Sequence, residues 1–271
     1  MPTLSIDGHD TYYERRGSGE PILLIQGLGG NVLHWGDGFL DGLLDGGFEL
    51  ILYDNRGAGR SGAIEGECSI ATLAGDAAAL LDELGVESAH VVGISMGGMV
   101  AQELALAHPE RVRTLTLGCS YPGGAEAKMT EQEVVGQLAE AVMSGDNERA
   151  VRAGFEVMLA PEFAADPANY EVYAKIAEQY PAPIATLMAQ LSAIIGHDTS
   201  ERLAQIDVPT LVVHGTADRL LESVNGELLA RLIPGARLEL LDGAGHMFFW
   251  EQPQRSAQLV REHVEAATGG E

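Results

Sequence analysis

Six short apolar runs, separated by longer segments, constrain the fold of this chain more than any other feature. The runs are rich in branched residues and too short to be helices, which is typical of strands buried on both faces. They span Ile22 to Ile25, Leu50 to Tyr53, His90 to Ile94, Val112 to Leu117, Leu211 to Val213 and Leu238 to Leu241. Because several of the intervening segments have helical spacing, we expect an α/β fold: a mostly parallel sheet with helices on both faces.

Three segments between or after these runs have the spacing of amphipathic helices. They are 70–84, which ends at Gly85, then 96–107, and 254 to about 266 behind Pro253. Leu4 to Asp7 and Thr11 to Arg15, on either side of Gly8, predict an antiparallel hairpin at one edge of the sheet.

The alternation of strands and helices stops between Tyr121 and Asp207, where helical patterns occur without a buried strand. We interpret this segment as an inserted helical cap. The predicted organisation is an α/β core in two parts, residues 1–120 and 208–271, interrupted by a cap over residues 121–207.

The charge of the chain argues against some partners. The 40 acidic and 16 basic side chains give a formal net charge of -24, which repels nucleic acids and anionic membranes. Cys68 and Cys119 are the only cysteines and lack metal-type spacing, so we expect two unpaired thiols and no metal site. No secretory signal is visible in Met1 to Asp10, which predicts a cytoplasmic protein.

The pattern G-x-S-x-G occurs at Gly93-Ile94-Ser95-Met96-Gly97. Alone it is weak evidence, because the chain contains 34 glycines. Its position between a predicted strand and a predicted helix is what a nucleophile elbow requires, since a serine in such a sharp turn projects its hydroxyl away from the backbone. The alternative is a glycine-rich packing turn.

A serine hydroxyl needs a histidine that accepts its proton and returns it to the leaving group. Of the eight histidines, His246 lies in a loop of small residues after the last predicted strand, and open α/β sheets bind their ligands at the carboxyl ends of strands. His90, His108, His214 and His263 fit structural positions better.

The histidine in turn needs a carboxylate that fixes its tautomer. Asp218 follows the strand Leu211 to Val213 and would lie at the same edge of the sheet, although it could also be a plain helix cap. Asp242 and Asp198 are the other candidates. The order Ser95, Asp218, His246 is that of α/β-hydrolases and differs from chymotrypsin-like and subtilisin-like enzymes.

Backbone amides should stabilise the oxyanion that forms during attack on a carbonyl. The Met96 amide follows the nucleophile, and the Leu28 amide lies in the glycine-rich loop Gln26-Gly27-Leu28-Gly29-Gly30 after a predicted strand. This loop lacks the phosphate-binding and dinucleotide-binding spacings, so we expect no cofactor.

Candidate residues of the substrate pocket come from the cap and from the loops around the site. Packing is the more frequent role for such methionines and aromatic residues. The candidates are His34, Trp35, Met129, Met158, His197 and Met247.

Together these motifs resemble the α/β-hydrolase family, especially its 3-oxoadipate enol-lactonase-like and aclacinomycin methylesterase-like members. The resemblance also covers segment 54–61, a structural turn, as well as His108-Pro109-Glu110-Arg111-Val112 and Glu251-Gln252-Pro253. It implies the nucleophile Ser95, the acid Asp218, the base His246 and the oxyanion amides of Leu28 and Met96. Gln26 departs from the histidine found in many members.

We therefore expect a serine hydrolase that cleaves a small or medium carboxylic ester or lactone, as a monomer or homodimer. Two alternatives stay open: a slow ligand-sensing protein with a hydrolase-like site, and a cofactor-free perhydrolase or haloperoxidase-like enzyme. The same triad serves many chemistries, so the sequence does not identify the substrate.

Overall fold

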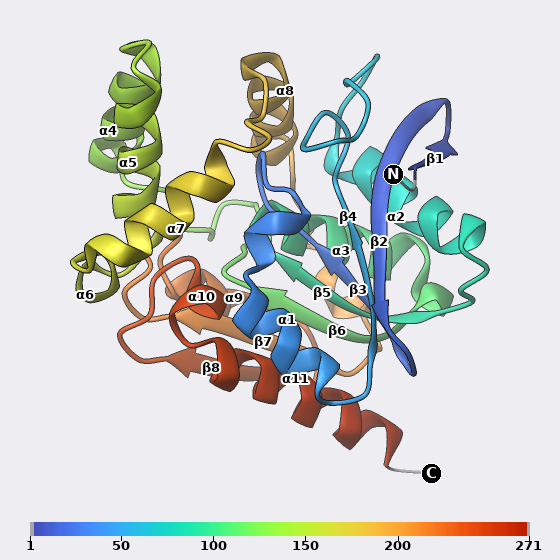
Figure 1. Cartoon of the computed structure of the whole chain (residues 1–271). Coiled ribbons are helices and arrows are strands. Elements are labelled where there is room, and N and C mark those ends of the chain that lie inside the picture. Colours follow the sequence, from blue (N-terminus) through green and yellow to red (C-terminus); the bar gives the residue numbers. More distant parts are fainter. Residues whose placement is uncertain (1–2, 270–271) are drawn as a thin grey trace.

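An eight-stranded sheet forms the centre of the computed structural model, which describes residues 3–269 (Figure 1). The strand order is β1-β2-β4-β3-β5-β6-β7-β8. β1 and β2 form the predicted hairpin, β2 also pairs antiparallel with β4, and the remaining strands are parallel. The strands are β1 (Thr3–Ile6), β2 (His9–Gly17), β3 (Pro21–Ile25), β4 (Glu49–Tyr53), β5 (Ala89–Ile94), β6 (Val112–Gly118), β7 (Thr210–Gly215) and β8 (Arg237–Leu241).

Helices cover both faces of the sheet, as the alternating pattern predicts. On one face, α2 packs against α3, and α9 lies against β7; on the other, α1 packs against α11. Figure 1 labels these helices: α1 (Asp37–Leu44), α2 (Ile70–Glu83), α3 (Met96–Ala107), α9 (Val224–Leu232), α10 (Phe248–Glu251) and α11 (Pro253–Thr268). Short 3-10 turns η1 (Val32–Trp35), η2 (Pro109–Arg111) and η3 (Leu203–Gln205) lie between them.

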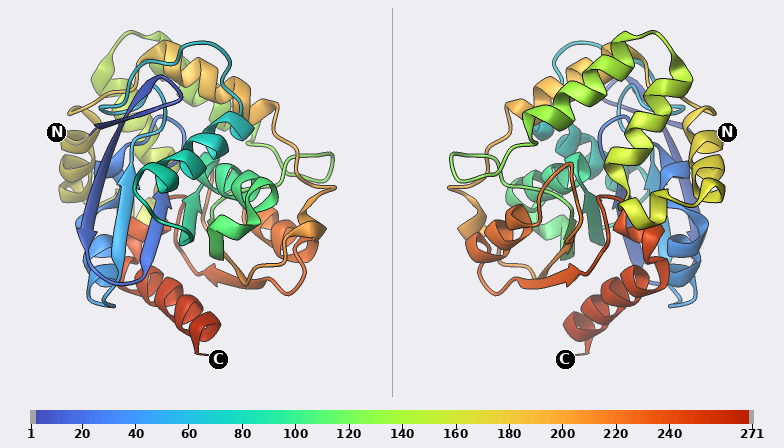
Figure 2. Two further views of the ribbon diagram at one scale, coloured as in Figure 1. Left: turned by 90° about the vertical axis from the view of Figure 1, so that its right-hand side faces the viewer. Right: turned by 90° about the vertical axis from the view of Figure 1, so that its left-hand side faces the viewer.

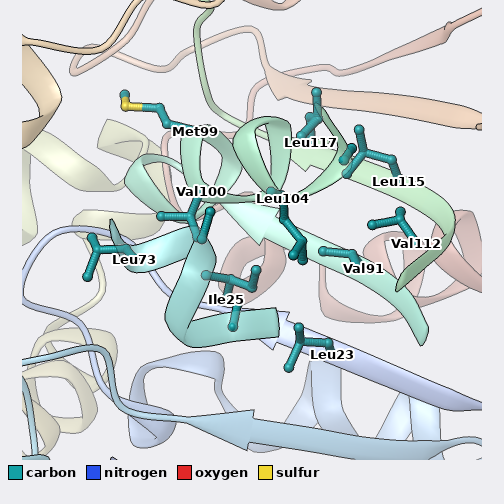
Figure 3. Close-up of a cluster of buried hydrophobic side chains, with 14 of the residues drawn as sticks. Leu23, Ile25, Leu73, Val91, Met99, Val100, Leu104, Val112, Leu115 and Leu117 are labelled. Atoms are coloured by element: carbon teal, nitrogen blue, oxygen red, sulfur yellow. The ribbon is translucent and has the colours of Figure 1, made fainter. Parts of the chain in front are cut away.

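The core has two halves because successive residues of a strand face opposite sides of the sheet. Leu23 and Ile25 of β3 belong to the cluster under α2 and α3, while Ile22 and Leu24 belong to the cluster under α1 and α11. Figure 3 shows the first cluster, in which Val100 and Leu104 of α3 lie with side chains from the central strands. Burial on both faces explains why these strands are continuous apolar runs.

A cap of five helices, α4 to α8, lies between β6 and β7 in the sequence and arches over one end of the sheet (Figure 2). Its helices are α4 (Gln132–Met143), α5 (Asn147–Met158), α6 (Pro161–Ala164), α7 (Pro167–Ala177) and α8 (Ile184–Ile195). An antiparallel bridge between Gly123 and Asp198 joins the two connections to the core. The α/β-hydrolase architecture with an inserted helical cap is confirmed, whereas the boundaries at residues 120 and 207 stay a prediction.

None of the helices within residues 3–269 combines the length and the apolar character that a membrane crossing requires.

The contact between β5, α3 and β3 depends on glycines in the predicted elbow. A Cβ on Gly97 would lie 2.1 Å from the carbonyl oxygen of Ile25, and one on Gly93 would lie 2.2 Å from the carbonyl oxygen of Gly97. Both distances are far inside van der Waals contact with backbone atoms, which cannot move aside as a flexible side chain can. Only glycine therefore permits α3 to approach the sheet this closely.

We expect Gly97→Ala to destabilise the protein by about 3 kcal/mol, because the added methyl group must displace α3 from β3. Gly75→Ala is the matched control: Gly75 lies in α2, and a Cβ there meets no atom within 4 Å. That control should stabilise the protein by about 0.5–1 kcal/mol through helix propensity. Urea unfolding measures both, and equal midpoints for the two variants would contradict this account.

Candidate active site

Ser95 lies in a sharp, strained turn between the central strand β5 and helix α3. Its backbone has φ 55 and ψ -123, a conformation that costs a residue with a side chain about 1–3 kcal/mol. A hydrogen bond from its amide to the carbonyl oxygen of Gly118, 2.9 Å long, ties the turn to β6. The G-x-S-x-G pattern thus lies between a strand and a helix, as a nucleophile elbow requires. Asp7 and Cys119 are the other described non-glycine residues with positive φ, and neither carries a hydroxyl.

The glycine-rich loop after β3 lies directly beside Ser95. A Cβ on Gly27 would be 3.1 Å from the Ser95 Cβ and 3.5 Å from its Oγ. Within residues 3–269, neither the Leu28 amide nor the Met96 amide donates a hydrogen bond to the protein. Two backbone donors near one hydroxyl are therefore available to an external acceptor.

Asp218 and His246 are hydrogen-bonded, with 2.8 Å between Asp218 Oδ2 and His246 Nδ1. Both residues are buried and follow neighbouring strands, β7 and β8. The amide of Ala217 donates to the carbonyl oxygen of Ala244 at 2.8 Å, which joins the loops that carry the two side chains. The carboxylate is further held by the amides of Leu220 and Leu221, which both donate to Oδ1 at 2.9 Å.

The charges of this pair stabilise one another. Burial alone would raise the pKa of Asp218, but the imidazoles of His246 and His214 outweigh it and hold the pKa well below its usual range. Burial alone would lower the pKa of His246, but the charge and hydrogen bond of Asp218, together with the contributions of Cys119, outweigh burial and raise the pKa well above 6.5. The arrangement therefore favours a carboxylate next to an imidazolium.

A second histidine, His214, contacts the same carboxylate oxygen. Its Nε2 lies 3.2 Å from Asp218 Oδ2 and 2.7 Å from the carbonyl oxygen of Leu221. A carbonyl oxygen only accepts, so Nε2 must carry the proton and donate to both oxygens. His214 Nδ1 is buried without a hydrogen-bond partner in the described part of the chain.

The loop before His246 is fastened to the cap. Glu251 accepts hydrogen bonds from the amide of Gly245 at 2.9 Å and from the amide of Ala160 at 3.3 Å. The amide of Met247 donates to the carbonyl oxygen of Met158 at 3.0 Å. The cap segment that follows α5 thus positions the loop that carries the imidazole.

Ser95 and His246 approach the same strand end. Cys119 follows Gly118, the bonding partner of the Ser95 amide, and its thiol lies near enough to His246 to affect the pKa of the ring. Within residues 3–269 the Ser95 hydroxyl and the imidazole are not hydrogen-bonded to each other. Such bonds are often long or absent in unliganded sites.

The candidate pocket residues occupy different environments. Met158 and Met247 lie together beside the His246 loop, and these two stay predicted pocket residues. Met129 is 56% exposed on the connection before α4. His197 lies at the base of the cap against Tyr121, with its pKa lowered to about 4 by burial. For Met129 and His197 a role in the pocket also stays a prediction.

Two further candidates, Trp35 and His34, make packing and capping contacts within the core domain. Trp35 is fully buried and stacks on Phe39, with ring centroids 5.7 Å apart, and its role in the pocket stays a prediction. His34 Nδ1 accepts a hydrogen bond from the amide of Asn31, and burial lowers the pKa of the ring to about 4. It caps η1, and its role in the pocket stays a prediction.

Segment 54–61 serves the fold next to the site. The carboxylate of Asp54 accepts from the amide of Val32 at 2.7 Å and from that of Arg60 at 2.8 Å. Arg56 forms a buried ion pair with Asp76 of α2. These contacts support the interpretation of the segment as a structural turn.

Three residues that contact the site were not predicted as part of it: His214, Glu251 and Gln190. The spacing His214-Gly-x-x-Asp218 was visible, but a histidine at a strand end is more often structural. Glu251 lies only five residues after His246, and this short spacing was the signal that its carboxylate could contact the His246 loop. Gln190 contacts the glycine-rich loop 161 residues away, and no local pattern reveals such a contact.

Comparisons with known proteins identify relatives of this chain. A family model described as alpha/beta hydrolase fold matches residues 20–253. The chain is 37% identical over 250 residues to "Putative carbamate hydrolase RutD" of Azorhizobium caulinodans, with 92% of each chain covered. It is 29% identical over 220 residues to 3-oxoadipate enol-lactonase 1 of Acinetobacter baylyi, which covers 81% of this chain and 79% of that protein.

Among solved structures, the enol-lactonase from Burkholderia xenovorans LB400 superimposes with a TM-score of 0.85 at 25% identity. The alignment covers 97% of this chain and 99% of that chain. The similarity therefore extends through the cap as well as the core.

Proposed function

This chain belongs to the α/β-hydrolase fold family, and from that premise we propose that it is a serine hydrolase that cleaves a small or medium carboxylic ester or lactone through an acyl-enzyme on Ser95. The observation that carries the proposal is the buried Asp218–His246 pair at the strand ends next to a strained serine. A strained serine conformation persists only where the surrounding structure enforces it, and such strain is concentrated at functional sites.

In the proposed reaction, the Ser95 hydroxyl turns toward His246 and attacks the substrate carbonyl while Nε2 of the imidazole accepts its proton. Asp218 stabilises the resulting imidazolium, which then protonates the departing alcohol. Water, activated by the same imidazole, attacks the acyl-enzyme and releases the acid. A lactone would follow the same steps, with its alcohol still attached to the acyl group.

The amides of Leu28 and Met96 would bind the oxyanion. Both are free of other acceptors in residues 3–269, and the closeness of Gly27 to the Ser95 hydroxyl supports a shared site. Fixed donors need no reorganisation when charge moves onto the oxygen, and a single such donor typically contributes 10²–10³ in kcat, which is about 3–4 kcal/mol.

One similar protein is named a 3-oxoadipate enol-lactonase and another a putative carbamate hydrolase. Both names support acyl transfer, but they indicate different substrates, namely lactones and carbamates. A panel of p-nitrophenyl esters of increasing chain length, lactones and carbamates would define it. We expect turnover of esters or lactones, and chain-length preference reports the depth of the pocket. Preference for carbamates, or faster peracid formation with added peroxide than hydrolysis, would replace the proposed substrate class.

A fluorophosphonate probe tests the nucleophile directly. We expect one covalent adduct per chain, assigned to Ser95 by peptide mass spectrometry. Ser120 is an internal comparison, because it lies beside the elbow but its hydroxyl already donates to the Ser95 carbonyl oxygen at 2.9 Å. An adduct on another residue, or none, would contradict the proposed nucleophile.

A further inference from the structure

Helix α8 of the cap places a fully buried glutamine, Gln190, against the glycine-rich loop. Its Oε1 accepts a hydrogen bond from the Gly29 amide at 2.8 Å, and its Nε2 donates to the carbonyl oxygen of Arg56 at 3.1 Å. A buried amide without partners would cost free energy, so these two bonds explain how a polar side chain is tolerated here. One side chain thus links the cap to two core loops.

The loop that Gln190 holds is a tight turn. The Gly30 amide donates to the Gly27 carbonyl oxygen at 3.1 Å, and Gly29 has φ 63, the positive value that a type II turn requires at its third residue. Because the peptide bond between Gly27 and Leu28 is planar and trans, the Leu28 N–H points opposite to the Gly27 C=O. The geometry of the turn therefore decides where the Leu28 amide points.

The cap also packs tightly on this turn. A Cβ on Gly29 would lie 2.6 Å from Leu187 Cδ2 and 3.2 Å from Ala182 Cβ. Leu187 lies in the first turn of α8, and Ala182 lies two residues before the helix begins. The start of α8 therefore covers the glycine-rich turn on the side from which Gln190 reaches it. The peptide between Leu28 and Gly29, which carries the Gly29 amide, is consequently held by residues of the cap and not by the core.

We propose that Gln190 is a positioning residue: by holding the Gly29 amide it fixes the turn that presents the Leu28 N–H to the developing oxyanion, so that docking of the cap completes the oxyanion hole. This inference rests on the proposed hydrolase function. It gives the cap a role in the chemical step in addition to covering the site.

Thr186 supplies a matched control on the same helix face. Its hydroxyl donates to the carbonyl oxygen of Gly57 at 3.2 Å, and the residue is only 5% exposed. Like Gln190 it forms a buried bond from α8 to the core, but its partner belongs to the loop after β4 and not to the oxyanion turn. Loss of either bond should loosen the cap, whereas only loss of the Gln190 bond should disturb the Leu28 amide.

The experiment compares Gln190→Met and Thr186→Val with the wild type, using one ester substrate. We expect Gln190→Met to lower kcat by about 10- to 100-fold, a part of the effect of removing an oxyanion donor, with KM changed less than about threefold. The affinity for a trifluoromethyl ketone, which forms a tetrahedral adduct, should fall by a similar factor. Thr186→Val should keep kcat within about threefold at a similar loss of Tm.

Equal kcat values for the two variants, or a loss confined to KM, would overturn the proposal. If Gln190→Met does not fold, Gln190→Asn answers the same question, because it keeps an amide that is one methylene too short to reach both partners; normal kcat in that variant would also overturn it. Wild-type turnover is measured in the same assay. Its absence would refute the proposed function, which distinguishes that failure from a failure of the Gln190 proposal.

Discussion

Ser95→Ala lowers kcat by about 10⁵, the loss expected when the nucleophile of a serine hydrolase is removed and only binding and oxyanion stabilisation remain. The physical reason is that no other described hydroxyl lies in a strained turn beside the Leu28 amide and the Asp218–His246 pair. Alanine fits the space of serine, so the variant should fold normally. The measurement is single-turnover and steady-state hydrolysis of the best ester from the panel.

Ser69→Ala is the control for this prediction. Ser69 caps α2, where its side chain accepts from the Thr72 amide at 3.1 Å, far along the chain from the elbow. Its loss should cost about 1 kcal/mol of stability and leave kcat unchanged. Stability and chemistry are thereby separated, and full ester turnover by Ser95→Ala would refute the assignment of the nucleophile.

Strands β3 to β7 were predictable because they are buried on both faces and form nearly continuous apolar runs. The expectation of burial on both faces was wrong for β8, because it is the edge strand and Leu240 is 41% exposed. Helix α3 was predicted with the bounds that the structure has, since Pro109 and the elbow define its ends. Helices α1 and α9 were not predicted. Gly38 and Gly42 weaken the helical pattern of α1, and it is stabilised mainly by packing against α11, which local sequence does not report.

In the site, too, local patterns predicted some residues, whereas contacts between distant segments determine others. Ser95, Asp218 and His246 could be predicted as a group because each follows a recognisable strand, and parallel strands bring their carboxyl ends to one edge of the sheet. His214, Gln190 and Glu251 act through contacts between loops and the cap, and those depend on how separate elements dock. The direction of a side chain is likewise not predictable from its position: the buried ring of Trp35 packs beside Phe39 in the core.

Asp218→Asn should lower kcat by about 10⁴ at neutral pH, because the amide would impose the wrong tautomer on His246. The amides of Leu220 and Leu221 both donate to Oδ1, so the oxygen of the asparagine should remain on that side. Its NH₂ group then faces the imidazole, which must present an unprotonated Nδ1 and carry its proton on Nε2. An imidazole in that tautomer cannot accept the proton of Ser95.

The pH profile gives a second, independent readout of the same variant. His246 acts as a base only when neutral, so activity falls as the pH drops below its pKa. In the wild type burial lowers that pKa, but the charge and hydrogen bond of Asp218, together with Cys119, raise it well above 6.5, which predicts an acid limb on the alkaline side of 6.5. Asparagine removes the charge while burial remains, so the acid limb of the residual activity should move to lower pH.

Asp242→Asn completes the test, because Asp242 lies four residues before His246 and was an alternative candidate for the carboxylate of the triad. It is exposed, and its side chain accepts only from the Thr216 hydroxyl, at 3.3 Å, among residues 3–269. We expect kcat within about twofold of the wild type and an unshifted acid limb, since a solvent-exposed charge acts weakly on a buried imidazole. If Asp242→Asn instead caused the larger loss, or if the acid limb of Asp218→Asn stayed in place, the carboxylate that orients His246 would have been assigned to the wrong residue.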